Sequence, residues 1–323
     1  MTQTEDEYDV VVIGGGAAGL GGAVTLGRCR RTVAVIDGGQ PRNAPAAGVH
    51  DYLTRDNLPP VELVRIGRQE AQGYGARLVD GHVARVLRAD DGRLDVRLAD
   101  GRTLTGRRLL VATGLVDELP DVPGLRERWG RDVLHCPYCH GWEVRDQQIA
   151  VLASGPMSVH QALLFRQLTD RITYLSHAQP PTPVQEEQLL ARGIRIVDTE
   201  VAGIEVVDDR VAAVHLADGT AVACQAVAVA TCMRARAGFL EGIGLTPVEH
   251  PFGVGEHLPA DPQGRTTAPG VWAAGNVTDP SAQVGAAAAA GAFAAAQINA
   301  DLAAEDTRLA VEARRADDAL AAR

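Results

Sequence analysis

The chain has 323 residues, which suits two domains of ordinary size, and 46% of them are hydrophobic, which is ample for buried cores. Its formal net charge of -10 at pH 7 excludes nucleic acid and anionic membranes as natural partners, because like charges repel at long range. Five cysteines are too few for a disulfide framework. The polar, acidic start at 1–8 is unlike a signal peptide, so we expect a globular protein of the cytoplasm.

Residues 8–20 carry the first pattern with chemical meaning. A β-branched apolar run ends in Gly-x-Gly-x-x-Gly at Gly14, Gly16 and Gly19, and an alanine-containing helix follows. Gly14 permits a tight turn, Gly16 lets backbone amides approach a pyrophosphate, and Gly19 lets helix and strand pack closely. The next strand ends at Asp37, 21 residues beyond Gly16, where a carboxylate can accept ribose hydroxyls. The sequence therefore predicts a site for an adenine dinucleotide.

Cys136 and Cys139 form a C-x-x-C pair within His-Cys-Pro-Tyr-Cys-His-Gly. Such a pair can close into a disulfide and reopen, but the same spacing also holds half of a zinc site. Zinc would need a second pair, whereas Cys29, Cys224 and Cys232 are scattered on a helix or near apolar strands. We interpret those three as small buried hydrophobic residues. The pair thus favours electron transfer through sulfur, and we expect no metal.

The middle and last thirds contain further strand and turn patterns. A proline- and glycine-containing stretch at 119–124 is typical of a linker, and the strands at 149–152 and 172–175 each precede a turn. Two other strands end in small or polar residues, namely Ala112, Thr113 and Gly114 after 109–111, and Gly275 and Asn276 after 270–274. The alanine-rich stretch 283–300 has the composition of a buried helix rather than a membrane span. Residues 301–323 alternate charges and alanine, which is typical of a solvated helix or frayed tail without chemical role.

Together these motifs resemble the thioredoxin-reductase-like flavoproteins over nearly the whole chain. The resemblance implies an α/β fold with two Rossmann-like, three-layer nucleotide-binding domains. Residues 1–119 and 239–323 would form a discontinuous FAD-binding domain, and 120–238 an inserted domain of the NAD(P)H type that carries the C-x-x-C pair. The resemblance also implies a homodimer.

The same resemblance assigns FAD to the first site. In this family an aspartate after the late glycine holds the ribityl chain, so we expect Asn276 to keep an altered contact. The start of the alanine-rich helix, at Gln283 and Val284, would face the flavin and stabilise negative charge on its reduced form. The predicted FAD-binding residues are Gly14, Gly16, Ala17, Ala18, Gly19, Asp37, Gly38, Gln40, Arg42, Asn43, His50, Asp51, Ala112, Thr113, Gly114, Gly275, Asn276, Gln283 and Val284.

The resemblance also implies roles for the residues around the thiols. Cys136 would be the exposed, low-pKa thiol that exchanges with substrate, and Cys139 the thiol next to the flavin. His140 stands where thioredoxin reductases have a general acid, and an imidazole can carry a thiol proton near neutrality; the alternative is a helix-start residue that bonds to solvent. Tyr138 and Trp142 either line a substrate pocket or serve packing.

The middle third departs from the family where NADPH binds. Relatives carry a second glycine motif at 153–158 and several arginines near 176–181, whereas this chain keeps only Gly155 and has no arginine there. Arginines hold a phosphate through charge-assisted, often bidentate bonds. The missing arginines do not exclude NADH, but Ala153 and Pro156 disfavour it, because they remove a turn glycine and an amide donor. We therefore predict that NADPH binds poorly, the alternative being a divergent pocket with cations from other loops.

Residues 136–143, Cys-Pro-Tyr-Cys-His-Gly-Trp-Glu, and the Arg42-Asn43 element are similar to dithiol oxidases of the gliotoxin and holomycin type. This resemblance implies oxidation of a small-molecule dithiol, with electrons passing through the enzyme disulfide and FAD to molecular oxygen (O2) and giving hydrogen peroxide. The domain rotation of the family would then be unnecessary, and we predict a disulfide held over the flavin. An NADPH-dependent or ferredoxin-linked thioredoxin reductase, or a redox sensor or dithiol-sequestering protein, stays open.

Overall fold

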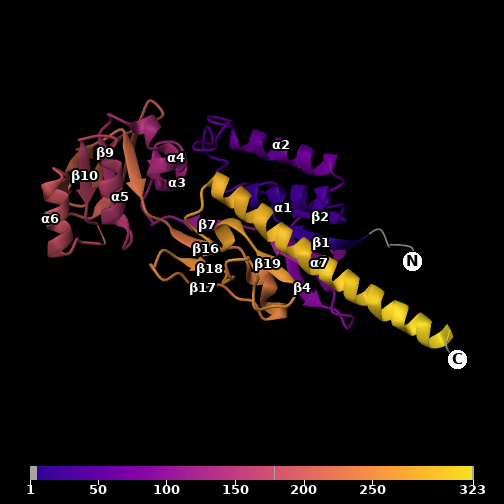
Figure 1. The fold of residues 1–323 in the computed structure, drawn as a ribbon. Helices are drawn as coiled ribbons and strands as arrows, with labels where there is room; N and C mark the ends of the chain where they lie inside the picture. The colour runs from indigo at the N-terminus through magenta and orange to yellow at the C-terminus, as the bar shows by residue number, and fades with distance from the viewer. Residues whose placement is uncertain (1–5, 178, 322–323) are drawn as a thin grey trace.

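The computed structural model describes residues 6–177 and 179–321. The acidic start at 1–5, Ala178 in the arginine-free segment, and the last two residues of the tail lie outside these ranges. Two β-sheet units lie next to each other and are joined by a narrow two-stranded ribbon (Figure 1). The long C-terminal helix runs across the first unit.

The first unit is built on a seven-stranded sheet. Its main path is β3 (Arg77–Asp80), β2 (Val33–Asp37), β1 (Glu7–Ile13), β6 (Thr103–Val111), β5 (Leu94–Leu98) and β4 (Val83–Arg88), with β19 (Val271–Ala273) pairing β6. β1 lies parallel to both neighbours, and Val12 stands opposite Val35 and Leu110. Residues Val10 to Ile13 are buried, as expected for a parallel strand covered on both faces. The carboxyl ends of β1, β2 and β6 therefore meet at one edge of the sheet.

Helices α1 (Ala17–Arg28), α2 (Pro60–Gly73) and α7 (Val284–Ala321) belong to this unit. Small residues let α1 and α7 approach closely, since a Cβ on Gly291 would lie 1.8 Å from the Ala18 carbonyl oxygen. One face of α7 is buried, as predicted for 283–300, but the helix starts at Val284 and Gln283 precedes it. The close packing places the second and third turns of α7 against the first two turns of α1.

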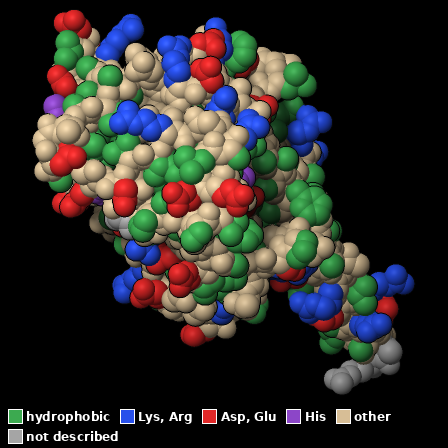
Figure 2. Space-filling view, turned by 90° about the vertical axis from the view of Figure 1, so that its left-hand side faces the viewer, with side chains coloured by type: hydrophobic (Ala, Val, Ile, Leu, Met, Phe, Trp, Pro, Cys, Tyr) green, Lys and Arg blue, Asp and Glu red, His purple; other side chains and the backbone are tan. Residues whose placement is uncertain are grey.

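The tail differs from a freely solvated segment in its first turns. Asp301 accepts a hydrogen bond from Arg108, and Arg107 is ion-paired with Glu305 and Asp306. The pKa of Asp306 is held below its usual range by its hydrogen bonds to Arg31 and Arg107. Farther along, the helix projects from the body and carries charged side chains of both signs (Figure 2). Ion pairs thus tie the start of this tail to strand β6.

The second unit contains a parallel five-stranded sheet and a small antiparallel one. The strands of the parallel sheet are, in order, β11 (Arg195–Val197), β10 (Ile172–Leu175), β9 (Ile149–Leu152), β15 (Ala226–Val229) and β8 (Val133–Leu134). The antiparallel sheet consists of β12 (Val201–Val207), β13 (Arg210–Leu216) and β14 (Ala221–Ala223). The helices are α3 (Leu125–Arg128), α4 (Pro137–His140), the 3-10 turn η1 (Trp142–Val144), α5 (Ser158–Phe165) and α6 (Pro183–Ala191).

The ribbon between the units pairs β7 (Leu115–Glu118) with β16 (Cys232–Ala235) in antiparallel register. The remaining short elements are η2 (Gly238–Ile243), β17 (Val248–Glu249), β18 (Glu256–His257) and η3 (Gly275–Val277). The expected α/β fold with Rossmann-like sheets is confirmed. The domain limits at 119/120 and 238/239 stay a prediction, and the ribbon lies next to both.

The interpretation of the three remaining cysteines as buried is wrong for Cys29, and Cys232 is only half-buried. Helix α1 ends at Arg28, and Cys29 stands exposed at its C-terminal cap. Cys224 is buried, and burial raises the pKa of its thiol to about 12. Among the described residues, no group of histidine, cysteine, aspartate and glutamate could hold a metal ion. No helix within those same ranges has both the length and the apolar character needed to cross a membrane.

Candidate active site

A cavity of about 1100 Å³ lies where the two units meet. It is lined by the three predicted redox residues, Cys136, Cys139 and His140. Every predicted FAD-binding residue also lines it except Gly19, Asp51 and Gly275. The volume is at the upper end of the range for small-molecule sites.

The glycine turn at the end of β1 is open toward this cavity. Gly14 has a φ of +108°, and a Cβ there would lie 2.3 Å from the Ala112 carbonyl oxygen. A Cβ on Gly16 would meet nothing within 4 Å, and no side chain caps the first turn of α1. Gly19 packs instead, because its Cβ would lie 1.8 Å from the Gly14 carbonyl oxygen. The uncapped helix start and its bare glycine fit a pyrophosphate.

Asp37 ends strand β2 on the same edge of the sheet, as predicted. Its carboxylate accepts hydrogen bonds from the amide of Gly39 at 3.2 Å and from Arg68 Nη1 at 2.9 Å. These bonds fix the carboxylate beside the glycine turn, where the ribose of a dinucleotide would lie. The residues present at this edge therefore fit FAD.

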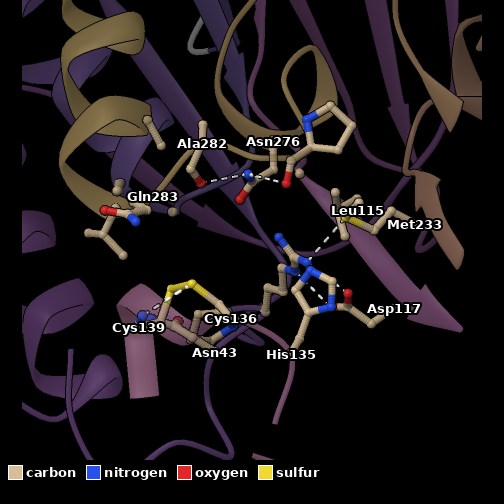
Figure 3. Close-up of a pocket in the computed structure, with 18 of the residues that line it drawn as sticks. Asn43, Leu115, Asp117, His135, Cys136, Cys139, Met233, Asn276, Ala282 and Gln283 are labelled. Carbon is tan, nitrogen blue, oxygen red and sulfur yellow. Dashed lines mark hydrogen bonds and ion pairs between the residues drawn. A yellow bond between two sulfur atoms is a disulfide. The ribbon is translucent and has the colours of Figure 1, made fainter. Parts of the chain in front are cut away.

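Asn276 acts on its own loop. Its Nδ2 donates to the carbonyl oxygens of Asp279, Pro280 and Ala282 at 3.0, 3.3 and 2.8 Å (Figure 3). The amide thereby closes the turn that delivers Gln283 to the cavity wall. An ionised aspartate could not make these bonds because it has no hydrogen to donate.

The disulfide lies on the opposite wall. Cys136 and Cys139 are bonded to each other with a Cα–Cα distance of 5.2 Å. Cys136 is the N-terminal cap of α4, and the amide of Cys139 donates to its Sγ at 3.1 Å. Figure 3 shows the disulfide facing Gln283 across the cavity. A reducible bond thus faces the place where the helix dipole of α7 begins.

His140 follows the disulfide directly. Burial lowers the pKa of its imidazole, and its Nε2 is buried without a hydrogen-bond partner. The ring of His50 lies 6.5 Å away, edge-on. His50 in turn contacts Asp56 at 3.1 Å and Glu143 at 3.5 Å. A neutral His140 can accept a thiol proton, and two carboxylates stand near its neighbour.

Four residues near the thiols were missed by sequence reasoning: His135, Asp117, Thr231 and Met233, all of which line the cavity. The carboxylate of Asp117 accepts two hydrogen bonds from the guanidinium of Arg42, at 2.6 and 2.7 Å, and a third from Thr231 Oγ1 at 2.7 Å. Burial alone would raise the pKa of Asp117, but the bonds and charge of Arg42 outweigh burial and hold the pKa below its usual range. The one available signal was the pair of acidic residues that follows Leu115 and Val116 in the sequence. Arg42, predicted to contact the cofactor, has most of its guanidinium committed to this carboxylate.

In the second glycine turn, at 153–158, the side chain of Ser158 bonds to the backbone amides of the turn. The hydroxyl of Ser158 accepts hydrogen bonds from the amides of Ser154 and Gly155 at 3.1 and 3.2 Å. Ser154 Oγ donates to the Ala230 carbonyl oxygen at 2.6 Å. Of the residues in this turn, only Met157 lines the cavity. Two amides that could face a phosphate are thus already satisfied.

The two aromatic residues beside the thiols differ in position. Tyr138 is 63% exposed and lines the cavity, whereas Trp142 does not line it and carries Arg145 over its ring at 4.2 Å. Tyr138 is therefore available to a ligand, and Trp142 belongs to a surface cation–π pair.

Fold and site together define a dinucleotide-binding protein with a cysteine pair on the wall of its cofactor cavity. The chain belongs to the pyridine nucleotide-disulphide oxidoreductase family, whose profile matches residues 8–296. It is an oxidoreductase, and the predicted FAD cofactor agrees with the FAD-binding, thioredoxin-reductase-like branch of this family.

Solved structures match along almost the whole chain. The crystal structure of HlmI has a TM-score of 0.91 and 44% identity, and the alignment covers 96% of this chain and 97% of that one. An oxidoreductase from Agrobacterium tumefaciens has a TM-score of 0.85 and 35% identity, with 92% and 98% covered. These alignments extend across both units, and the resemblance to thioredoxin-reductase-like proteins is confirmed by relatives that carry that name.

Curated relatives match over shorter stretches. Thioredoxin reductase sirT of Leptosphaeria maculans is 40% identical over 149 residues, which are 45% of this chain and 45% of the relative. The chain spans between 39% and 65% of the length of this relative and two others.

Proposed function

We propose that the protein is an FAD-dependent dithiol oxidase that closes an intramolecular disulfide in a small-molecule dithiol. Electrons would pass through Cys136–Cys139 and FAD to molecular oxygen, giving hydrogen peroxide. The observation that carries the proposal is the second glycine turn, where Ser158 takes the amides of Ser154 and Gly155. The protein thus keeps a disulfide facing a dinucleotide cavity but lacks an open second phosphate cradle.

The surroundings of that turn support the same conclusion. A phosphate dianion needs charge-assisted donors, and the described residues of 176–181 include no arginine. His177, which stands where a cation would be expected, accepts a hydrogen bond from the amide of Val201 on its Nδ1. NADPH would therefore meet two amides that already have a hydrogen-bond acceptor and no arginine among the described residues of 176–181.

The chemistry begins at Cys136. A substrate thiolate attacks Cys136 Sγ, a mixed disulfide forms, and the Cys136–Cys139 bond breaks with Cys139 leaving as thiolate. The second substrate thiol then attacks the substrate sulfur that is bonded to Cys136. The cyclic disulfide leaves, and Cys136 keeps the electron pair as a thiolate. The substrate has then lost two electrons and two protons. FAD, when bound, would accept these electrons from the enzyme thiols, pass them to oxygen and so allow the enzyme disulfide to form again.

His140 and helix α7 support these steps through charge. The lowered pKa of His140 keeps its imidazole neutral near pH 7, so it can accept the proton of an attacking thiol. The first turn of α7, positioned by the Asn276 amide, offers the positive end of a helix dipole to negative charge in the cavity.

One experiment separates this proposal from its rivals. The yellow FAD-loaded protein is mixed with dithiothreitol in air, and oxygen uptake and peroxide are followed with and without NADPH. The proposal expects uptake that NADPH does not change and that Cys136→Ser abolishes. Rapid flavin reduction by NADPH, with no oxygen uptake from any dithiol, would instead support a thioredoxin reductase.

The proposal includes a homodimeric protein of the cytoplasm. Light scattering of the loaded protein tests the dimer, and fractionation of the source cells tests the location.

A further inference from the structure

An irregular segment of the first unit, residues 41–58, reaches the second unit and is called the strap. Within the strap, an isolated antiparallel β-bridge pairs Val49 with Leu58. Three of its residues meet partners outside it: Arg42 at Asp117, Pro45 at Gly130, and His50 at Glu143. The strap therefore contacts the chain on both sides of the cysteine pair.

The firmest of these contacts lies at the ribbon between the units. Asp117 is in β7, its side chain is 7% exposed, and it receives two bonds from Arg42. Thr231, directly before β16, donates to the same carboxylate at 2.7 Å. Arg42 Nη2 also contacts the Sδ of Met233, the residue that pairs with Asp117 across the ribbon. One buried carboxylate thus joins the strap to both strands that connect the units.

The other two contacts flank the disulfide. A Cβ on Gly130 would lie 2.6 Å from Pro45 Cβ, so the strap fits against the second unit only because this position is glycine. His50 Nε2 lies 3.5 Å from a carboxylate oxygen of Glu143, which is in η1 directly after α4. A change in orientation between the units would have to break all three contacts together.

We propose that Asp117 is a positioning residue that, with Arg42 and Thr231, holds the Cys136–Cys139 disulfide facing the cofactor cavity throughout turnover. The inference rests on the proposed function, in which no nicotinamide has to reach the flavin and no rotation is needed. The physical reason is the cost of separation. Opening the ribbon would leave a buried carboxylate and a guanidinium without partners, and such unpaired charges are strongly unfavourable.

The test compares variants of the FAD-loaded protein by hydrogen exchange. Asp117→Asn keeps the shape but removes the charge, and Arg42→Lys keeps the charge but loses the bidentate geometry. The matched control is Arg234→Gln, which removes the ion pairs of an exposed arginine in the same ribbon to Glu118 and Glu256. Amides at 44–50 and 128–131 should exchange about tenfold faster in Asp117→Asn, because exchange follows the population of the opened state. Arg42→Lys should fall between this variant and the wild-type protein.

A second measurement reads the disulfide itself. Anaerobic flavin reduction by dithiothreitol should be insensitive to solvent viscosity in the wild-type protein and in Arg234→Gln. In Asp117→Asn it should slow and acquire viscosity dependence, because a loosened second unit must return by diffusion before electrons reach the flavin.

Equal exchange in Asp117→Asn and Arg234→Gln would overturn the assignment. A rise in exchange rate that is equally large in the core strands β1 and β9 would also overturn it, because such a rise indicates general destabilisation. Hydrogen exchange needs neither oxygen nor a dithiol, so its result stands apart from oxygen uptake. A protein that takes up no oxygen but loosens selectively in Asp117→Asn would refute the oxidase and keep the positioning role.

Discussion

The Asn276→Asp substitution probes how the start of α7 is held. The change replaces one donor nitrogen by an oxygen while keeping the size of the side chain. Three carbonyl oxygens, of Asp279, Pro280 and Ala282, lie 2.8–3.3 Å from that nitrogen. An ionised carboxylate would lose these bonds and bring negative charge against three carbonyl dipoles.

The cost can be worked from these contacts. One bond of 2.8 Å and one of 3.0 Å are short enough to count fully, and the third is longer. At about 1 kcal/mol for each net bond, and more for leaving the two half-buried acceptors unsatisfied, we expect a loss of about 2–4 kcal/mol in the free energy of unfolding. The turn before Gln283 should also loosen, and FAD affinity should fall.

The pH dependence gives the sign of the effect. A protonated carboxyl can donate one hydrogen bond to these carbonyls, so folding raises the pKa of the introduced group above its unfolded value. The variant therefore regains stability as pH falls below that raised pKa and loses it as pH rises through it. Wild-type protein, with a neutral amide, should lack this component.

Urea unfolding at several pH values measures the free energy, and flavin fluorescence measures FAD affinity. Asn299→Asp is the matched control, because Asn299 Oδ1 only accepts a hydrogen bond, from Arg31 at 2.8 Å, and a carboxylate keeps that contact. Equal stability of the Asn276→Asp variant and this control at pH 7 to 8, with unchanged FAD affinity, would refute the reasoning.

Two further predictions concern His140 and Ser158. His140→Gln should slow anaerobic flavin reduction by dithiothreitol by about 100-fold or more, as expected for loss of a general base. The wild-type rate should fall at acid pH, because the imidazole, whose pKa is lowered by burial, becomes protonated there. Stopped-flow measurements at several pH values check this. The same fall at acid pH in the His140→Gln variant would count against the assignment. Ser158→Ala should lower the free energy of unfolding by about 1–3 kcal/mol, because two half-buried amides lose their acceptor. NADPH titration of this variant should stay without saturation; unchanged stability in urea would mean that the hydroxyl does not close the turn.

Local features were predictable because neighbours along the chain make them. The turn at Gly14 and Gly16 and the closure of Cys136 with Cys139 depend on residues within a few positions of each other. The position of Asp37 follows from the length of one strand–helix–strand unit. Sequence alone therefore established a dinucleotide turn and a reducible pair.

Other features depended on partners far away in the chain. Arg42 and Asp117 are 75 residues apart, so nothing local indicated that the arginine would pair with a buried carboxylate at the ribbon. Cys29 lies outside the core because α1 ends one residue earlier, and Arg107 meets the tail 198 residues later. The side-chain amide of Asn276 bonds to its own loop, and this orientation depends on the directions of three backbone carbonyl groups.

The amino-acid sequence by itself determined which chemistry the chain can carry, since backbone-permissive glycines and closely spaced thiols act through local geometry. Only the tertiary structure decided how that chemistry is aimed, because the cavity, the strap and the buried ion pair arise when surfaces distant in sequence are packed together. Burial makes those long-range pairings strong, and it becomes defined only once the chain has folded.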